Sequence, residues 1–193
     1  MPLSPEKVNE LLRNRRSVFP ISYIDKPIPR EIIEQVLENA NWAPNHKQTE
    51  PWRFVVFRED GLKRLSDYLG EHYKANTEAS KFLEAAYLKS MEKPLQSSCV
   101  IAICIQRDEA ERLPEWEEIA ATACAVQNMY LTCSAYGIGC YWSTPKAIIE
   151  ADEFLELGPG QRCLGMFYMG YHEQETFNPR RKPIENKTRW VED

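Results

Sequence analysis

The spacing of apolar residues predicts alternating helices and strands. Apolar side chains recur three and four residues apart, as on one face of a helix, in several segments. These segments are a short one that starts at Ser4 and Pro5, the stripe from Ile32 to Ala40, residues 62–92, and residues 115–136. A further helix is expected from Thr144-Pro145 to Leu157. Thr144 followed by Pro145 repeats the pattern of Ser4 and Pro5, in which an N-cap residue precedes a proline in the first turn.

Runs rich in β-branched, aromatic and other apolar residues lie between the helical segments and predict strands. They cover residues 52–57, 100–105, 139–142 and 163–168. The run from Val100 to Ile105 is continuously apolar, which is typical of a strand buried on both faces. Strands separated by helices predict an α+β or α/β fold around one central sheet, with residues 1–193 as a single domain.

Composition narrows the function classes. The 193 residues carry a net charge of −5, which argues against binding to duplex DNA. The sequence contains no run of 18 or more apolar residues, so no membrane span is expected. The N-terminal residues lack the apolar core of a signal peptide. None of the six cysteines forms a C-x-x-C pair. We therefore expect buried, reduced cysteines and a cytoplasmic protein.

Three segments suggest further roles. Small residues fill the middle of the helix predicted over 115–136, so another backbone could approach closely. Residues 62–92 carry aromatic side chains that either form a lid over a binding pocket or pack helix on helix. These are Tyr68, Tyr73, Phe82 and Tyr87. Residues 173–193 contain no apolar run and are either a frayed terminus or an arm that lies across a partner subunit.

Several common catalytic motifs are absent. The chain has no G-x-S-x-G, no G-x-G-x-x-G and no P-loop, and its three histidines never stand four residues apart. Neither a dinucleotide-binding motif nor a metal site is therefore expected, and redox chemistry would need another cofactor.

Arg15-Arg16-Ser17 is a candidate phosphate site. Two guanidinium groups and a hydroxyl beside the end of a short helix can hold a phosphate dianion. The alternative is a pair of surface arginines that only complement the helix dipole.

The loop from Trp42 to Trp52 is a second candidate. It combines aromatic rings, amide donors and rigid prolines, which suit the edge of a planar heterocycle. The alternative is an ordinary connection whose tryptophans cap the core.

Taken together, these motifs resemble the FMN-dependent nitroreductase family, and in particular its compact single-domain members. The resemblance rests on motifs that follow one another in the family's order over nearly the whole chain. They are Arg15-Arg16-Ser17, Trp42 to Lys47, Glu50 to Val56, Gly137 to Thr144, and Arg181-Lys182-Pro183.

The resemblance implies a mainly antiparallel sheet flanked by helices in three layers, and an intertwined homodimer with FMN sites at the interface. The helix from Glu115 to Tyr136 would pack against its mate, and the arm 173–193 would cross to the partner. Residues that would bind the cofactor are Arg15, Arg16, Ser17, Trp42, Asn45, His46, Trp142, Ser143, Thr144 and Arg181. His46 would reach the flavin from the partner subunit.

The implied activity is transfer of hydride from NADH or NADPH through FMN to a small organic acceptor such as a nitroaromatic or a quinone. No protein side chain would be catalytic, because flavin N5 carries the chemistry. Two alternatives stay open: an FMN-binding protein with a storage, sensor or chaperone-like role, and a purely structural dimer.

Two positions depart from the family pattern. The family has a third arginine soon after Arg-Arg-Ser, whereas this chain continues with Val18-Phe19-Pro20. Glu50 stands where the family has glutamine, and a carboxylate cannot donate the hydrogen bonds of an amide. The role of Glu50 is therefore left open.

Overall fold

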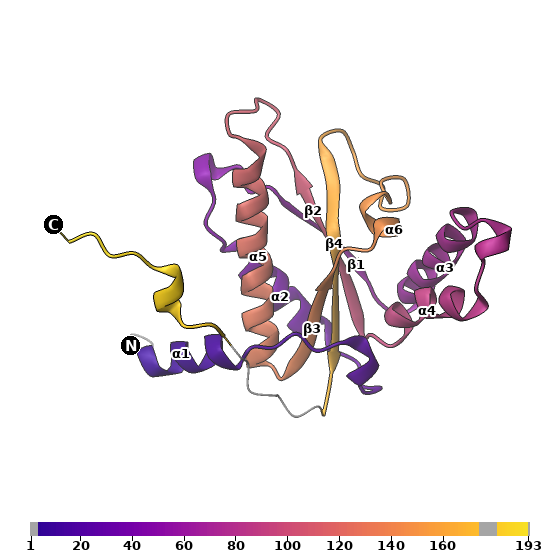
Figure 1. Ribbon diagram of the computed structural model, residues 1–193, viewed down its shortest axis with the longest axis horizontal. Coiled ribbons are helices and arrows are strands. Elements are labelled where there is room, and N and C mark those ends of the chain that lie inside the picture. The colour runs from indigo at the N-terminus through magenta and orange to yellow at the C-terminus, as the bar shows by residue number, and fades with distance from the viewer. Residues whose placement is uncertain (1–3, 174–180, 193) are drawn as a thin grey trace.

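A four-stranded sheet forms the centre of the fold (Figure 1). The computed structural model of the protein describes residues 4–173 and 181–192. The strands are β1 (Trp52–Phe57), β2 (Cys99–Gln106), β3 (Ile138–Ser143) and β4 (Gln161–Tyr171), in the order β1-β2-β4-β3. Every neighbouring pair is antiparallel. The predicted mainly antiparallel sheet is confirmed.

Strand β2 is apolar because it is central and is covered on both faces. Ile101 and Ile103 belong to one core cluster, and Val100 and Ala102 belong to the cluster on the opposite face. Alternate residues of a strand point to opposite faces, so a continuous apolar run feeds both layers.

Helices α2 (Arg30–Asn41) and α5 (Glu115–Ala135) cover one face of the sheet (Figure 1). Val36 and Ala40 of α2 share a core with Ala125 and Met129 of α5. The other face is covered by α3 (Asp60–Ala75) and α6 (Lys146–Ile149), through Leu65 and other buried residues. The three predicted layers are therefore present.

Helix α4 (Glu84–Leu95) pairs with α3, and the two helices stand on the far side of the sheet from α5 (Figure 1). The rings of Tyr73, Phe82 and Tyr87 lie 5.5–6.4 Å apart, centroid to centroid. The hydroxyl of Tyr68 donates to the carbonyl of Ala147 at 3.0 Å. Tyr73, Phe82 and Tyr87 thus pack against one another at the α3–α4 pair, as the helix-packing interpretation expects, and a lid stays a prediction.

The chain begins with α1 (Pro5–Asn14), and the hydroxyl of Ser4 accepts a hydrogen bond from the amide of Lys7, as an N-cap residue does. The remaining helical segments are short 3-10 turns. They are η1 (Pro20–Ser22), η2 (His46–Gln48), η3 (Ala79–Lys81) and η4 (Ile184–Lys187).

Three predictions were wrong. The helix expected from Thr144 to Leu157 ends at Ile149, because the chain turns to bury Ala151 and Leu155. Thr144 is not its N-cap residue; Pro145 takes that position, without a side-chain hydrogen bond. Cys124 is exposed on α5, whereas the other five cysteines are buried.

No helix in the described part of the chain is long and apolar enough to cross a membrane. Across residues 4–173 and 181–192, no cluster of three or more His, Cys, Asp and Glu side chains could hold a metal ion. Of the arm predicted over 173–193, residues 174–180 and 193 lie outside the described residues, and 181–192 are exposed throughout.

Candidate functional site

Three of the predicted cofactor-binding residues meet around Tyr130 near the C-terminal end of α5. The guanidinium carbon of Arg15 lies 4.9 Å from the centre of the Tyr130 ring. The Tyr130 hydroxyl accepts a hydrogen bond from the amide of Trp142 at 2.8 Å, and the side chain of Ser17 lies near enough to lower the pKa of the phenol. The end of α1 and strand β3 are thus joined at one phenol.

Burial raises the pKa of Tyr130, and the hydrogen bonds of Ser17 and Trp142 together with the charge of Arg15 oppose this rise only in part. The phenol therefore stays neutral and can both donate and accept hydrogen bonds. Sequence reasoning missed Tyr130, because a tyrosine within a helical pattern gives no local sign of a partner on another element.

Segment 15–18 follows β3 closely. Ser17 forms a parallel bridge with Cys140, and the amide of Val18 donates to the Cys140 carbonyl at 3.0 Å. This contact holds the Arg-Arg-Ser segment at the edge of the sheet. The guanidinium of Arg16 binds the backbone of its own segment, since its Nη1 donates hydrogen bonds to the carbonyls of Arg13 and Arg15 at 2.5 and 2.8 Å.

Gly165 of β4 makes room for the end of β3. It has φ +132°, and a β-carbon there would lie 2.5 Å from the Ser143 carbonyl oxygen and 2.6 Å from Trp142 Nε1. The β2–β4 register shifts at this point, so Gly165 sits at a bulge. Trp142 Nε1 is buried and has no hydrogen-bond partner among the described residues. Thr144 and Arg181 are exposed, and Ser143 is half-buried.

The other predicted residues lie in the loop between α2 and β1. Trp42 is 78% exposed and donates from Nε1 to Glu38 Oε1 at 2.9 Å. Asn45 Oδ1 accepts a hydrogen bond from the amide of Glu50 at 3.1 Å. His46 Nδ1 lies 2.8 Å from Glu117 Oε2 on the first turn of α5.

This loop has a strained backbone. Lys47, Gln48 and Glu50 have φ of 53°, 55° and 42°, the left-handed region that residues other than glycine seldom adopt. Such conformations cost roughly 1–3 kcal/mol each and persist only where the surroundings enforce them. Glu50 contributes to the loop through its backbone, because its carbonyl accepts from Arg53 Nη1 at 2.9 Å.

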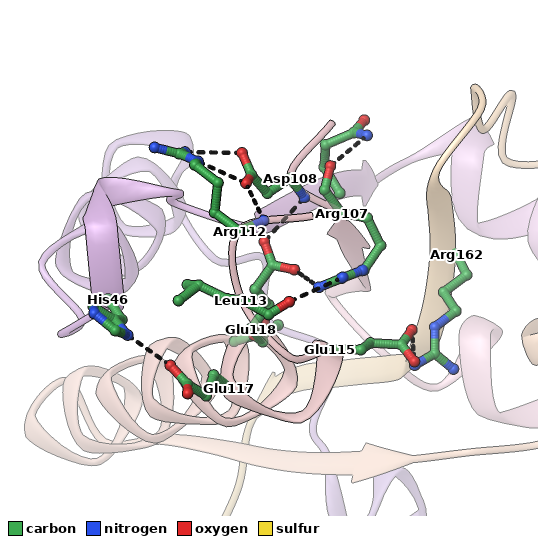
Figure 2. A network of polar contacts seen from close by, with 11 residues as sticks. His46, Arg107, Asp108, Arg112, Leu113, Glu115, Glu117, Glu118 and Arg162 are labelled. Carbon is green, nitrogen blue, oxygen red and sulfur yellow. Dashed lines mark hydrogen bonds and ion pairs between the residues drawn. The ribbon is translucent and has the colours of Figure 1, made fainter. Parts of the chain in front are cut away.

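A network of charges surrounds the start of α5 (Figure 2). Glu118 is fully buried and forms an ion pair with Arg107. Its Oε1 accepts a hydrogen bond from the amide of Asp108 at 3.0 Å. The side chain of Arg112 forms two hydrogen bonds of 2.8 Å with Asp108. These bonds from Arg112 lower the pKa of Asp108 to about 2. None of this network was predicted from the sequence.

The two groups of predicted residues stand at opposite ends of α5. Arg15 contacts Tyr130, whereas His46 contacts Glu117, and these positions are thirteen residues apart. At 1.5 Å per residue the separation along the helix is about 20 Å. A single chain therefore does not bring all the predicted residues together.

The exposed side of α5 connects these ends. Ala120, Ala123 and Cys124 are exposed, and Trp116 is 66% exposed. A surface hollow of about 540 Å³ lies beside them. Its lining includes Pro44, Asn45, His46, Trp116, Glu117, Ala120 and Cys124.

Comparison with known proteins identifies the family of the chain. The model of the nitroreductase family matches residues 12–171. YdjA of Escherichia coli strain K12, which carries the provisional name NAD(P)H nitroreductase, is 31% identical over 165 residues, covering 83% of this chain and 86% of YdjA.

Solved structures share the fold. A nitroreductase-like family protein from Bacillus cereus has a TM-score of 0.80 and 27% identity, with full coverage of both chains. The FMN-dependent nitroreductase NfnB from Mycobacterium smegmatis, solved in complex with NADPH, has a TM-score of 0.76 and 14% identity over 97% of this chain and 99% of its own. The resemblance inferred from the sequence motifs is confirmed, and the chain belongs to the nitroreductase family.

Proposed function

We propose that the chain is an FMN-dependent oxidoreductase that passes hydride from NADH or NADPH to a small organic acceptor such as a nitroaromatic or a quinone. The observation that carries this proposal is the cluster of Arg15, Ser17 and Trp142 around Tyr130. Family membership and the name of YdjA support it.

The residues present suit the cofactor. The guanidinium of Arg15 and the hydroxyl of Ser17 can hold the phosphate, since both donate hydrogen bonds to an anion. The buried, unpartnered Nε1–H of Trp142 suits a ligand edge that carries acceptors, because an unpaired buried donor is costly. Gly165 leaves the space in which the end of β3 can take this position.

A second copy of the chain would complete each site. In a twofold dimer packed along the exposed side of α5, the Arg15 end of one helix meets the His46 end of the other. Trp42, Asn45 and His46 then come from the partner. The small exposed side chains Ala120 and Ala123 allow the two helices to approach closely.

The C-terminal arm belongs to the same assembly. Ile184, Trp190 and Val191 are 65%, 79% and 72% exposed, an apolar surface with no cover on its own protomer. We place this arm across the partner, where Arg181 would add to the phosphate site. Because five buried thiols need no oxidising environment, the cytosol suits the protein.

When bound, FMN supplies the hydride chemistry that links a nicotinamide donor to the acceptor. The protein's contribution is binding and orientation. Arg15 and Ser17 would anchor the phosphate, Trp142 would hold one edge of the cofactor, and the strained loop at His46 would border it from the other subunit.

The absorption spectrum of the purified protein tests the proposal. We expect a yellow protein that releases FMN on denaturation and is bleached by NADH or NADPH without oxygen. A colourless protein that takes up no added FMN would contradict the proposal. Bound FMN that neither nucleotide reduces would favour the non-catalytic alternative.

A further inference from the structure

We propose that Glu117 is a positioning residue for the cofactor site: by binding His46 it holds the strained loop 45–50 in the conformation that borders the flavin. This inference rests on the proposed function, because it assigns a purpose to a loop that the function places beside FMN. The contact itself joins residues 71 positions apart in the sequence.

The chemistry of the contact is specific. A carboxylate only accepts hydrogen bonds, so the 2.8 Å contact requires a proton on His46 Nδ1. Nε2 is then the atom left to face a ligand. The side chain of Glu117 is 25% exposed and that of His46 is 60% exposed. The more buried partner is thus the fixed one, and the imidazole is the one that is oriented.

The loop needs such a restraint. Its three left-handed residues, Lys47, Gln48 and Glu50, are strained, so an unrestrained chain would leave this conformation. Lys47 Nζ gives a second restraint, since it donates to the carbonyl of Arg112 at 3.3 Å. Helix α5, through Glu117, and segment 107–114, through the carbonyl of Arg112, therefore both hold the loop.

The base of this restraint is rigid. The ion pair between Arg107 and the buried Glu118 ties segment 107–114 to α5, and Arg107 Nη2 also donates to the carbonyl of Leu113 at 3.2 Å. Figure 2 shows Glu117 directed toward the loop and Glu118 directed toward segment 107–114. Neighbouring carboxylates on one helical turn thus fix two different segments.

Glu115 offers a matched control. It lies on the same first turn of α5 and pairs with Arg162 of β4 at 2.8 Å, without contacting the loop. Replacement of either Glu115 or Glu117 by alanine removes one negative charge from the helix N-terminus, so both variants lose the same dipole interaction. Only Glu117→Ala releases His46.

The first measurement needs no flavin. Trypsin cleaves after Lys47 when the loop opens, so Glu117→Ala should raise the rate of this cleavage about tenfold, whereas Glu115→Ala should change it less than about twofold. Glu117→Gln should restore protection, because an amide oxygen also accepts from Nδ1–H. Equal cleavage of all variants and wild type would overturn the proposal.

The second measurement is FMN binding. Glu117→Ala should weaken it about tenfold and alter the visible circular dichroism of bound FMN, with Glu117→Gln and Glu115→Ala close to wild type. In a His46→Ala background, Glu117→Ala should have no further effect, because the two residues act as one unit. Additive losses, or equal losses in Glu115→Ala, would overturn the positioning role.

The two hypotheses fail separately. Wild-type protein that takes up no FMN would refute the proposed function and with it the cofactor role of Glu117, while the trypsin rates would still decide whether Glu117 holds the loop. If the wild type binds FMN and Glu117→Ala binds it equally tightly, only the inference about Glu117 is refuted.

Discussion

Arg15 lies where its charge can both bind a ligand and stabilise the fold. Its guanidinium lies over the Tyr130 ring, and it is half-buried rather than fully exposed. A cation over an aromatic face contributes about 0.5–1 kcal/mol to stability. A hydrogen bond to a charged group contributes more, about 1.5–3 kcal/mol. The ligand contribution should therefore dominate.

Arg15→Ala should weaken FMN binding by about 1.5–3 kcal/mol and should leave the weaker binding of riboflavin, which lacks the phosphate, nearly unchanged. Titration of the apoprotein with both ligands measures this difference. Arg13→Ala, two residues earlier in the last turn of α1, is the matched control and should affect neither ligand. Equal losses for FMN and riboflavin would show that Arg15 supports the fold and does not bind the phosphate.

Gly165→Ala should destabilise the apoprotein by about 2–3 kcal/mol, because φ of +132° suits only glycine and the new methyl group would meet the backbone of Ser143. Bound FMN should be lost as well, since Trp142 would move. Chemical denaturation gives the free energy of unfolding. Gly158→Ala, where the nearest atom is 3.9 Å away, should cost less than about 0.5 kcal/mol.

At the scale of elements, the first turn of α5 contrasts a buried charge with an exposed one. Glu118 has no exposed side-chain surface, whereas Glu115 and its partner Arg162 are about half exposed. A buried carboxylate is tolerated because the guanidinium of Arg107 and the amide of Asp108 satisfy it.

Glu118→Gln should lower the free energy of unfolding by roughly 3–5 kcal/mol, because it leaves the charge of Arg107 uncompensated. Glu115→Gln should cost at most about 1 kcal/mol, as for other exposed pairs. Urea denaturation of both variants provides the comparison. Similar losses in the two variants would mean that Arg107 finds another partner or reaches water.

The sequence was sufficient for elements whose signal is local. The bounds of β1 were predicted at Trp52 and Phe57, because β-branched and aromatic residues fill the strand and a turn signal follows it. The length of the four-residue α6 was not predicted, because it depends on how Ala151 and Leu155 pack under the sheet.

The site was predictable only where its residues lie close together in the sequence. Arg15 and Ser17 lie two residues apart in one short motif, so the sequence alone indicated their candidate role. The role of Tyr130 was not visible, because its partners lie just after α1 and on β3. Glu117 was missed for the same reason, since no local pattern links it to His46.

At the scale of the whole molecule, the exposed side of α5 should be an interface. Ala123→Arg places a charge against its own twofold mate, a like-charge contact that should weaken the dimer about a hundredfold. Sedimentation across a concentration series measures this, and FMN should be released in parallel. Ala85→Arg, on the exposed side of α4, is the control and should leave both unchanged. Flavin-loaded monomers of Ala123→Arg would contradict the shared site.

The placement of Arg15 and His46 at opposite ends of one helix has a genetic consequence. In a mixed dimer of an Arg15→Ala subunit and a His46→Ala subunit, one site carries both lesions and the other carries neither. Two alleles that are each defective alone should therefore complement when expressed together, and the mixture should recover about a quarter of the wild-type sites if subunits pair at random. Two alleles altered at the same end of α5, such as Arg15→Ala and Ser17→Ala, should fail to complement.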